Sequence, residues 1–274
     1  MASEWSFGCL AAYLAFSGLV LAVGGHGALA LLHAAGVTAS FAAARRARRE
    51  RRQGRVERWT EIAPLFVWPF LYFELPALIA TLGSGYHDAT VQAWELRLFS
   101  TNPSQTLAGA LPWRPLSELL HAGYLAYYPA IFLPPLRLLL RDDARALSQT
   151  MLALACTYAI CWLVYAFFPV EGPRYLWTPP HIPDGPIRRL TTQILAGGSS
   201  RGAAFPSSHM AIATVQAVLA TRWQPRVAIL LWLVAATIGV GAVYGGFHYG
   251  VDMVAGLILG GAVGMGVLYG ARRR

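Results

Sequence analysis

The chain has 274 residues, of which 56% are hydrophobic and only 13% are charged, and its formal net charge is +9 at pH 7. Because soluble domains carry about 25% charged residues, this composition excludes an ordinary soluble domain and indicates an integral membrane protein. Every basic residue is an arginine, and most arginines lie in short loops between apolar stretches. Such positions set membrane topology and argue against a nucleic-acid partner.

Apolar stretches of about 17–25 residues can cross a bilayer as helices. The chain contains seven candidates, at about residues 6–34, 62–82, 117–139, 148–168, 206–221, 227–245 and 249–269. We therefore predict an all-α fold, a polytopic transmembrane bundle of six to seven spans that forms a single structural domain. Residues 1–116 would hold the N-terminal spans with a basic and an amphipathic loop, and residues 117–274 would form a helical core.

Arginine positions predict the orientation of these spans. The segment from Arg45 to Arg58 holds eight arginines and is expected in the cytoplasm. Alternating from there places the N-terminus outside and the C-terminus inside, together with the arginines of 137–145 and 222–226. The first stretch has no basic segment followed by a cleavage site, so it is expected to be a retained span. A composition rich in Ala, Gly and Arg without Lys favours a high-GC bacterial source, and hence the bacterial inner membrane.

Two long loops are expected on the outer side. In the first, 83–116, residues 89–99 have apolar groups near helical spacing and are expected to lie along the membrane interface. The second, 169–205, is rich in Pro, Gly and Ser, and loops of this length are usually functional or disordered. The three cysteines lie inside apolar stretches, with neither a disulfide framework nor a metal-binding spacing.

Polar residues able to bind phosphate occur at the outer ends of two predicted spans. Arg174, in the segment 169–175, can hold a phosphate through two parallel N–H groups. The segment 205–209 reads Phe-Pro-Ser-Ser-His. A proline in the first turn of a helix leaves the next backbone N–H groups free as an anion site. His209 adds a group that gives or takes a proton near pH 7, although a plain helix cap is the alternative interpretation.

A third polar segment, 244–252, contains His248 and Asp252 at the outer end of the last predicted span. Residues four apart share a helix face, so Asp252 would accept one ring N–H of His248 and leave the other nitrogen as a nucleophile. Ionisable residues just inside an apolar helix are costly and indicate a functional site. A structural hydrogen bond that ties the helix end is the alternative.

These three segments resemble the type 2 phosphatidic acid phosphatase (PAP2) superfamily. The pattern of that family is Lys-x6-Arg-Pro, then Pro-Ser-Gly-His, then Ser-Arg-x5-His-x3-Asp. The matching residues here are Arg174, the run Pro206-Ser207-Ser208-His209, and the pair His248 and Asp252. The resemblance covers roughly residues 117–270, with all three motifs in order and on the same predicted side of the membrane.

The resemblance implies a PAP2-like helical core and a phosphohistidine mechanism that needs no metal or other cofactor. His248 would attack phosphorus, and His209 would protonate the leaving oxygen and then act as a base. Arg174, Ser207, Ser208 and the helix N-terminus would bind the phosphate oxygens. The substrate would be a membrane lipid, and the oligomeric state is left open.

The sequence departs from the family pattern at four points. These are Phe167 in place of Lys, Tyr175 in place of Pro, Ser208 in place of Gly, and Gly241-Ala242 in place of Ser-Arg. Two phosphate-holding cations are therefore missing. Arg201 is the first candidate to replace one of them, followed by Arg188 and Arg189, although positions in an ordinary solvated loop are the alternative for all three.

Further residues are candidates to line a substrate entrance. They are Glu118, His121, Tyr175 and Tyr244, all near the outer ends of predicted spans. A helix cap with an aromatic belt at the membrane interface accounts equally well for Glu118 and His121. Glu74, near the middle of the second predicted span, is expected to pair within the bundle because it lies too deep for a surface phosphate.

The acceptor of the phosphoryl group would decide the function. Water gives a lipid phosphate phosphatase, which we predict. A lipid hydroxyl gives a head-group phosphotransferase, as in relatives resembling inositol phosphorylceramide or sphingomyelin synthases, and a site with few cations suits the single charge of a phosphodiester. A non-catalytic lipid-binding or transport protein is the third possibility, against which the intact His209, His248 and Asp252 argue.

Overall fold

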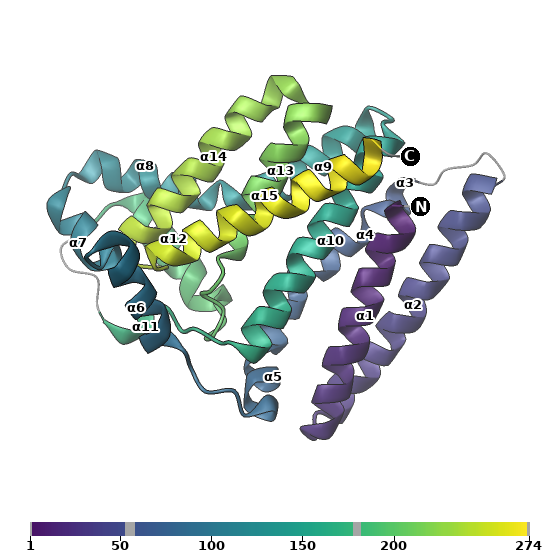
Figure 1. The fold of residues 1–274 in the computed structure, drawn as a ribbon, viewed down its shortest axis with the longest axis horizontal. Coiled ribbons are helices and arrows are strands. Elements are labelled where there is room, and N and C mark those ends of the chain that lie inside the picture. The colour runs from purple at the N-terminus through teal and green to yellow at the C-terminus, as the bar shows by residue number, and fades with distance from the viewer. Residues whose placement is uncertain (1, 53–57, 178–181, 273–274) are drawn as a thin grey trace.

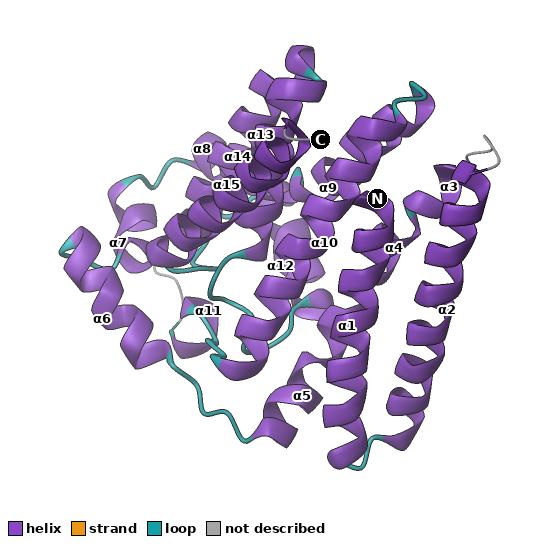
Figure 2. Ribbon diagram, turned by 45° about the vertical axis from the view of Figure 1, so that its right-hand side comes forward, coloured by secondary structure: helices purple, strands orange, loops and turns teal. Residues whose placement is uncertain are grey.

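The structure is a computed structural model that describes residues 2–52, 58–177 and 182–272, and all its regular elements are helices (Figures 1 and 2). The first half of the chain forms α1 (Ala2–Val23), α2 (Gly27–Arg52), α3 (Arg58–Glu61), α4 (Ala63–Val67), the 3-10 helix η1 (Phe70–Glu74), α5 (Leu75–Leu82), α6 (Asp88–Phe99), α7 (Pro103–Ala110), α8 (Arg114–Leu125) and α9 (Tyr127–Leu140). The second half forms α10 (Ala144–Phe167), α11 (Pro173–Leu176), α12 (Pro186–Gly198), α13 (Ser208–Trp223), α14 (Pro225–Tyr244) and α15 (Gly250–Arg272).

Six helical segments in the described part of the chain are long and apolar enough to cross a membrane. They are Glu4–Val23, Gly27–Glu50, Trp59–Leu82, Ala144–Phe167, Pro225–Tyr244 and Gly250–Ala271. The predicted all-α membrane bundle of six to seven spans is therefore confirmed, but its members differ from those expected. The stretch 117–139 is divided at Ala126 into α8 and α9, and α13 has only 16 residues.

The expected single span 6–34 is wrong, because it is divided into the hairpin of α1 and α2. The chain turns at Gly24-Gly25, where Gly25 adopts a left-handed φ of 80° that favours glycine. An Arg48–Glu4 ion pair of 2.7 Å joins the far ends of the two helices. The N-terminus and the basic segment thus lie at the same end of the molecule (Figure 1), and the expectation that the membrane separates them is also wrong. Residues 53–57 of that basic segment lie outside the described residues.

The centre of the bundle is α10, which packs against α1, α5, α9, α13 and α15. Next to it, α13 and α15 approach closely through three glycines of α15 at four-residue spacing. A Cβ on Gly256 would lie 2.6 Å from the carbonyl oxygen of Ser207, and one on Gly260 would lie 2.3 Å from that of Ala211. Small residues at this spacing let transmembrane helices pack backbone to backbone. The contact brings the N-terminal ends of α13 and α15 together.

Candidate active site

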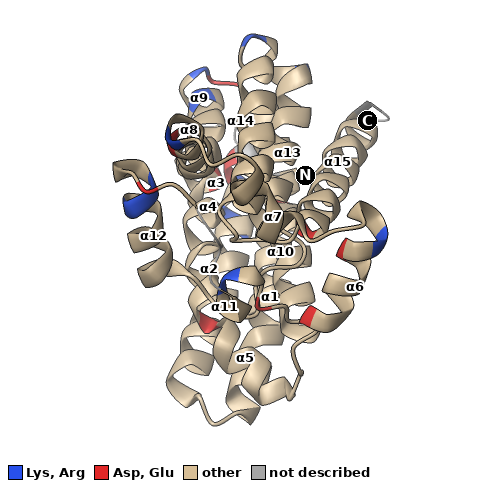
Figure 3. Ribbon diagram, turned by 90° about the vertical axis from the view of Figure 1, so that its left-hand side faces the viewer, with Lys and Arg blue, Asp and Glu red and all other residues tan. Residues whose placement is uncertain are grey.

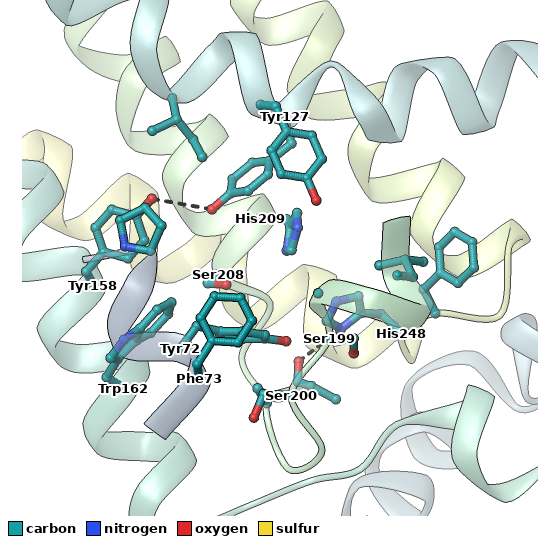
Figure 4. Close-up of a pocket in the computed structure, with 18 of the residues that line it drawn as sticks. Tyr72, Phe73, Tyr127, Tyr158, Trp162, Ser199, Ser200, Ser208, His209 and His248 are labelled. Atoms are coloured by element: carbon teal, nitrogen blue, oxygen red, sulfur yellow. Dashed lines mark hydrogen bonds between the residues drawn. The ribbon is translucent and has the colours of Figure 1, made fainter. Parts of the chain in front are cut away.

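A cavity of about 410 Å³ lies where the N-terminal ends of α13 and α15 meet α11 and the broken segment Trp59–Leu82. One end of this cavity is polar and contains His209, His248 and Arg174. The other end is formed by aromatic side chains, including Phe70 and Phe73 of η1. Figure 4 shows both histidines and this aromatic wall around the same space.

The Nδ1 atom of His248 faces two hydrogen-bond acceptors. It lies 3.0 Å from the carbonyl oxygen of Ala204 and 3.2 Å from Oδ2 of Asp252. Because both partners can only accept, the proton of a neutral imidazole resides on Nδ1. Nε2 then carries the lone pair, on a ring that lines the cavity. The arrangement favours a nucleophilic Nε2.

Asp252 connects His248 with the start of α13, and its side chain is fully buried. Its Oδ2 accepts the backbone N–H of Tyr249 at 2.8 Å as well as that of the His248 ring. Its carbonyl oxygen accepts the backbone N–H of Ser207 at 3.1 Å. One residue of α15 thus orients the ring of His248 and holds the start of α13 beside it.

His209 lies in the first turn of α13, among tyrosines. Its ring is stacked on Tyr124 with centroids 5.1 Å apart, and its centroid lies 3.9 Å from that of Tyr127. Nε2 of His209 and the hydroxyl of Tyr124 are 3.5 Å apart. The rings of His209 and His248 lie 6.2 Å apart, centroid to centroid. The two rings therefore come close enough for one to act on the leaving group of a phosphate attacked by the other.

The start of α13 is more occupied than a free anion site would be. Ser207 is the N-cap, and its hydroxyl accepts the N–H of Met210 at 3.3 Å. The N–H of Ser208 donates to the hydroxyl of Tyr165 at 3.0 Å. The expectation that Pro206 falls in the first helical turn is wrong, because Pro206 precedes the cap. Ser208 lines the cavity, whereas Ser207 acts as the helix cap that the sequence offered as an alternative.

Arg174 is the only arginine among the described residues that line the cavity. Its Nη2 donates to the hydroxyl of Tyr175 at 2.7 Å, and its guanidinium lies 4.5 Å from the centre of the Tyr175 ring. The Tyr175 hydroxyl also lies 3.1 Å from the hydroxyl of Ser199. Tyr175, which the sequence marked as substrate-lining, therefore lies in the cavity wall and orients Arg174.

The candidate replacement cations have other partners. Arg201 forms an ion pair with Glu171, and its guanidinium lies 5.5 Å from the centre of the Tyr175 ring. Arg188 donates to the carbonyl oxygen of Ile182, and Arg189 to Asp184. None of these three arginines is among the residues that line the cavity. Glu171 does line it, so the pair with Arg201 holds this carboxylate at the rim.

Glu118, His121 and Tyr244 also lie outside the cavity wall. Glu118 accepts the N–H groups of Ile187 and Arg188 at 2.9 and 3.1 Å, which satisfies the N-terminal turn of α12. Nδ1 of His121 lies 2.6 Å from the carbonyl oxygen of Ser117, and the Tyr244 hydroxyl donates to Leu111. For Glu118 the structure matches the alternative, a helix cap.

Two acidic residues of α6, which the sequence analysis did not select, support two of the three motif segments, 169–175 and 244–252. Asp88 accepts the N–H groups of Glu171 and Gly172, both at 2.9 Å, and the hydroxyl of Tyr249 at 3.0 Å. Glu95 accepts the N–H groups of Gly250 and Val251 at 2.9 and 2.7 Å.

The expected interfacial helix 89–99 is therefore also a support of the site. Burial raises the pKa of Glu95, while the hydrogen bonds from Val251 and Gly250 lower it. Asp88 and Glu95 are seven residues apart, two helical turns, so they share a face of α6. That spacing was the available signal, because it places two hydrogen-bond acceptors on the same side of α6.

A family model described as PAP2 superfamily matches residues 91–265. The chain therefore belongs to the PAP2 superfamily, and this membership supports a phosphatase-like function. The match begins within α6 and includes all three motif segments. Comparison with curated proteins gave no match, and comparison with solved structures gave none either.

Proposed function

We propose that the protein is a membrane enzyme that cleaves the phosphoester bond of a lipid phosphate through a phosphohistidine at His248. The observation that carries the proposal is the double contact of His248 Nδ1 with Ala204 and Asp252, which leaves Nε2 with its lone pair. The aromatic end of the cavity supports a substrate with an apolar part.

The reaction takes place in two steps. Nε2 of His248 forms a P–N bond while the P–O bond to the lipid breaks, and His209 gives the leaving oxygen its proton. A water molecule that His209 deprotonates then attacks phosphorus, the P–N bond breaks, its electron pair returns to Nε2, and inorganic phosphate leaves. Arg174 and the hydroxyl of Ser208, both in the cavity wall, stabilise the phosphate oxygens in each step.

The proposed site faces the extracytoplasmic side of the membrane. Arginines at the end of α9, between α13 and α14 and at the start of α10 lie at one end of the bundle, where Arg137 contacts Gln224 and Arg145 contacts Ala271 (Figure 3). By the positive-inside rule that end is cytoplasmic. The start of α13 and the start of α15, which carry the histidines, lie at the opposite ends of their helices.

The test uses the purified full chain in detergent with phosphatidic acid as the probe. We expect release of inorganic phosphate, and a loss of about 10³-fold or more in kcat for His248→Ala. Acid-labile, base-stable label from a ³²P-phosphate lipid should appear on the wild-type chain after rapid quenching. If the His248→Ala variant still turned over lipid phosphates at the wild-type rate, the mechanism would be disproved.

The proposed chemistry is independent of metal ions, because His248, His209 and Arg174 supply the nucleophile, the proton and the charge. We expect the rate of phosphate release to be unchanged by EDTA. A rate that falls with EDTA and returns with added Mg²⁺ would contradict this part of the proposal.

A second candidate function is transfer of a phosphorylated head group from one lipid to the hydroxyl of another. The observation that favours it is the low positive charge of the cavity, where Arg174 is the one arginine among the described lining residues and Glu171 adds a carboxylate. A phosphodiester carries one negative charge and suits such a site better than a phosphomonoester. Incubation with phosphatidylinositol and ceramide discriminates the two: product that forms only with the acceptor lipid supports transfer, and free phosphate from phosphatidic acid supports hydrolysis.

A further inference from the structure

A second hollow lies directly beyond the aromatic end of the candidate active site. It has a volume of about 530 Å³ and is lined by Trp59, Ile62, Ala63, Phe66, Phe132 and Leu136. Phe66 and Phe132 also line the first cavity, so the two hollows share these two side chains. Their rings are stacked, with centroids 5.5 Å apart and an interplanar angle of 24°. This aromatic pair, from α4 and α9, is the partition between the two spaces.

We propose that a hydrocarbon chain of the substrate lipid extends from the cavity past the Phe66–Phe132 pair into this second hollow, and that the pair sets the chain length that the enzyme prefers. The inference rests on the proposed function, because it places the phosphate of the same lipid at His248. It adds a tail-binding subsite between α4 and α9.

The lining of the second hollow fits a hydrocarbon chain. All six of its lining residues are apolar, and Trp59 is the first residue of the candidate span Trp59–Leu82. Phe66 and Trp59 have 52% and 66% of their surface exposed, which on a membrane-spanning segment means exposure to lipid. A chain in this hollow would therefore lie alongside the bilayer with no polar group to desolvate.

Continuity with the catalytic end decides between substrate and bulk lipid as the occupant. Phe66 and Phe132 belong to both hollows, and Tyr127, which also lines the first cavity, packs against His209. A lipid whose phosphate lies between the two histidines has its ester oxygen facing this aromatic wall. The second hollow is then the next apolar space along the chain, whereas an unrelated bilayer lipid would have its head group at either membrane surface.

Four of the six residues that line this subsite come from outside the region that the family model matches. Trp59, Ile62, Ala63 and Phe66 precede residue 91, where the match begins, whereas Phe132 and Leu136 of α9 lie within the match. The subsite is therefore a property of this chain's N-terminal part, combined with α9. The hydrocarbon chain of the substrate leaves lipid and not water when it binds, so only packing contributes to its binding free energy. We therefore expect changes of about three- to tenfold in chain-length selectivity.

The test compares dioctanoyl with dipalmitoyl phosphatidic acid and measures kcat/KM for each. Ala63→Trp fills the second hollow from an exposed position and should lower the long-to-short ratio about three- to tenfold. Phe66→Ala opens the partition and should raise the ratio. Ala39→Trp, an exposed position on α2 that lines neither hollow, is the matched control and should leave the ratio unchanged. An active enzyme whose ratio is the same in all three variants would overturn the inference.

A second measurement does not depend on turnover. The probe is phosphatidic acid with a diazirine on the terminal acyl carbon, bound to the His248→Ala variant, crosslinked by light and mapped by mass spectrometry. Label on Trp59, Ala63 or Leu136 supports the subsite, and label spread over α2 or confined to the first cavity overturns it. If the wild-type chain hydrolyses no lipid phosphate, the proposed function fails, while this labelling still decides whether the second hollow binds the chain.

Discussion

The polar end and the aromatic end of the candidate cavity are fixed in place by different interactions. At the polar end, Asp88 and Glu95 of α6 accept four backbone N–H groups from the segments that precede Arg174 and begin α15. At the aromatic end, η1 is attached to the N-terminal hairpin by side chains. Glu74 pairs with His33 at 2.6 Å and accepts the Tyr13 hydroxyl at 3.1 Å.

This difference separates two tasks. Hydrogen bonds that a buried carboxylate accepts from backbone N–H groups fix the main chain itself, which suits groups that must hold a nucleophile within a fraction of an ångström. A contact through three side chains leaves the backbone of the aromatic wall with more freedom, which suits a surface that accommodates a hydrocarbon chain. The family match includes Glu95 and the backbone segments that it and Asp88 hold, and it does not include Asp88 itself, η1 or the N-terminal hairpin. We therefore expect changes at the polar end to lower kcat and changes at the aromatic end to alter KM and lipid preference.

The largest expected effect is that of Asp252→Asn. An amide in place of the carboxylate no longer fixes the proton of His248 on Nδ1, so the ring loses its productive tautomer. We expect kcat for phosphatidic acid hydrolysis to fall about 10³- to 10⁴-fold, with little change in KM. Asp184→Asn, which alters an exposed ion pair with Arg189, is the control and should keep full activity. If size-exclusion chromatography shows that Asp252→Asn is folded and the variant retains most of its kcat, then Asp252 does not orient His248 for catalysis.

The next effect is on stability, at Asp88. The carboxylate of Asp88 accepts charge-assisted hydrogen bonds from the N–H groups of Glu171 and Gly172. The amide of Asp88→Asn has only one, uncharged acceptor oxygen for these two donors. We expect a loss of about 2–3 kcal/mol in unfolding free energy, measured by thermal unfolding in detergent, and a parallel fall in kcat because the segment that carries Arg174 is released. Equal melting temperatures for Asp88→Asn and wild type would show that α6 does not hold the polar end.

A smaller effect is expected at Glu74. Glu74→Gln removes the charge from a buried pair with His33, and such changes in a membrane interior cost about 1–2 kcal/mol. Because η1 carries Tyr72 and Phe73 into the cavity wall, we expect KM for dipalmitoyl phosphatidic acid to rise several-fold while kcat stays within about twofold. His26→Gln, at the exposed turn of the hairpin, is the control. A Glu74→Gln enzyme that loses kcat with unchanged KM would show that the wall takes part in the chemistry.

Local patterns in the sequence were sufficient for the fold class and for the three motif segments. Stretches of apolar residues predicted a helical membrane bundle, and the four-residue spacing predicted that His248 and Asp252 meet, although His248 precedes the start of α15. Glu74 was expected to pair within the bundle, and it does. The first span was wrong because apolar length was given more weight than the glycines at the turn, of which Gly25 has a positive φ.

Tertiary contacts account for what the sequence did not supply. The aromatic wall of the cavity includes residues of η1, α9 and α10, and nothing local to Tyr72 or Trp162 indicates that they line the same cavity as His209. The partners of Arg201 and Glu118 are likewise set by distant segments, Glu171 and the start of α12. Short polar motifs therefore predicted the residues of the polar end, and gave no information on the shape of the space beside them.

The smallest expected effect is that of Arg201→Gln, and it tests how many arginines bind the phosphate at the polar end. Arg201 is an exposed partner of Glu171 and lies outside the cavity wall, and exposed ion pairs contribute little. We expect kcat/KM for phosphatidic acid to change by no more than about threefold, against about 10²-fold or more for Arg174→Gln, which removes the one arginine in the described wall. The two variants carry the same change in charge, so net charge cannot explain a difference between them. Equal losses would mean that Arg201 leaves Glu171 and reaches the phosphate during the reaction. Two arginines would then balance the charge of a phosphomonoester.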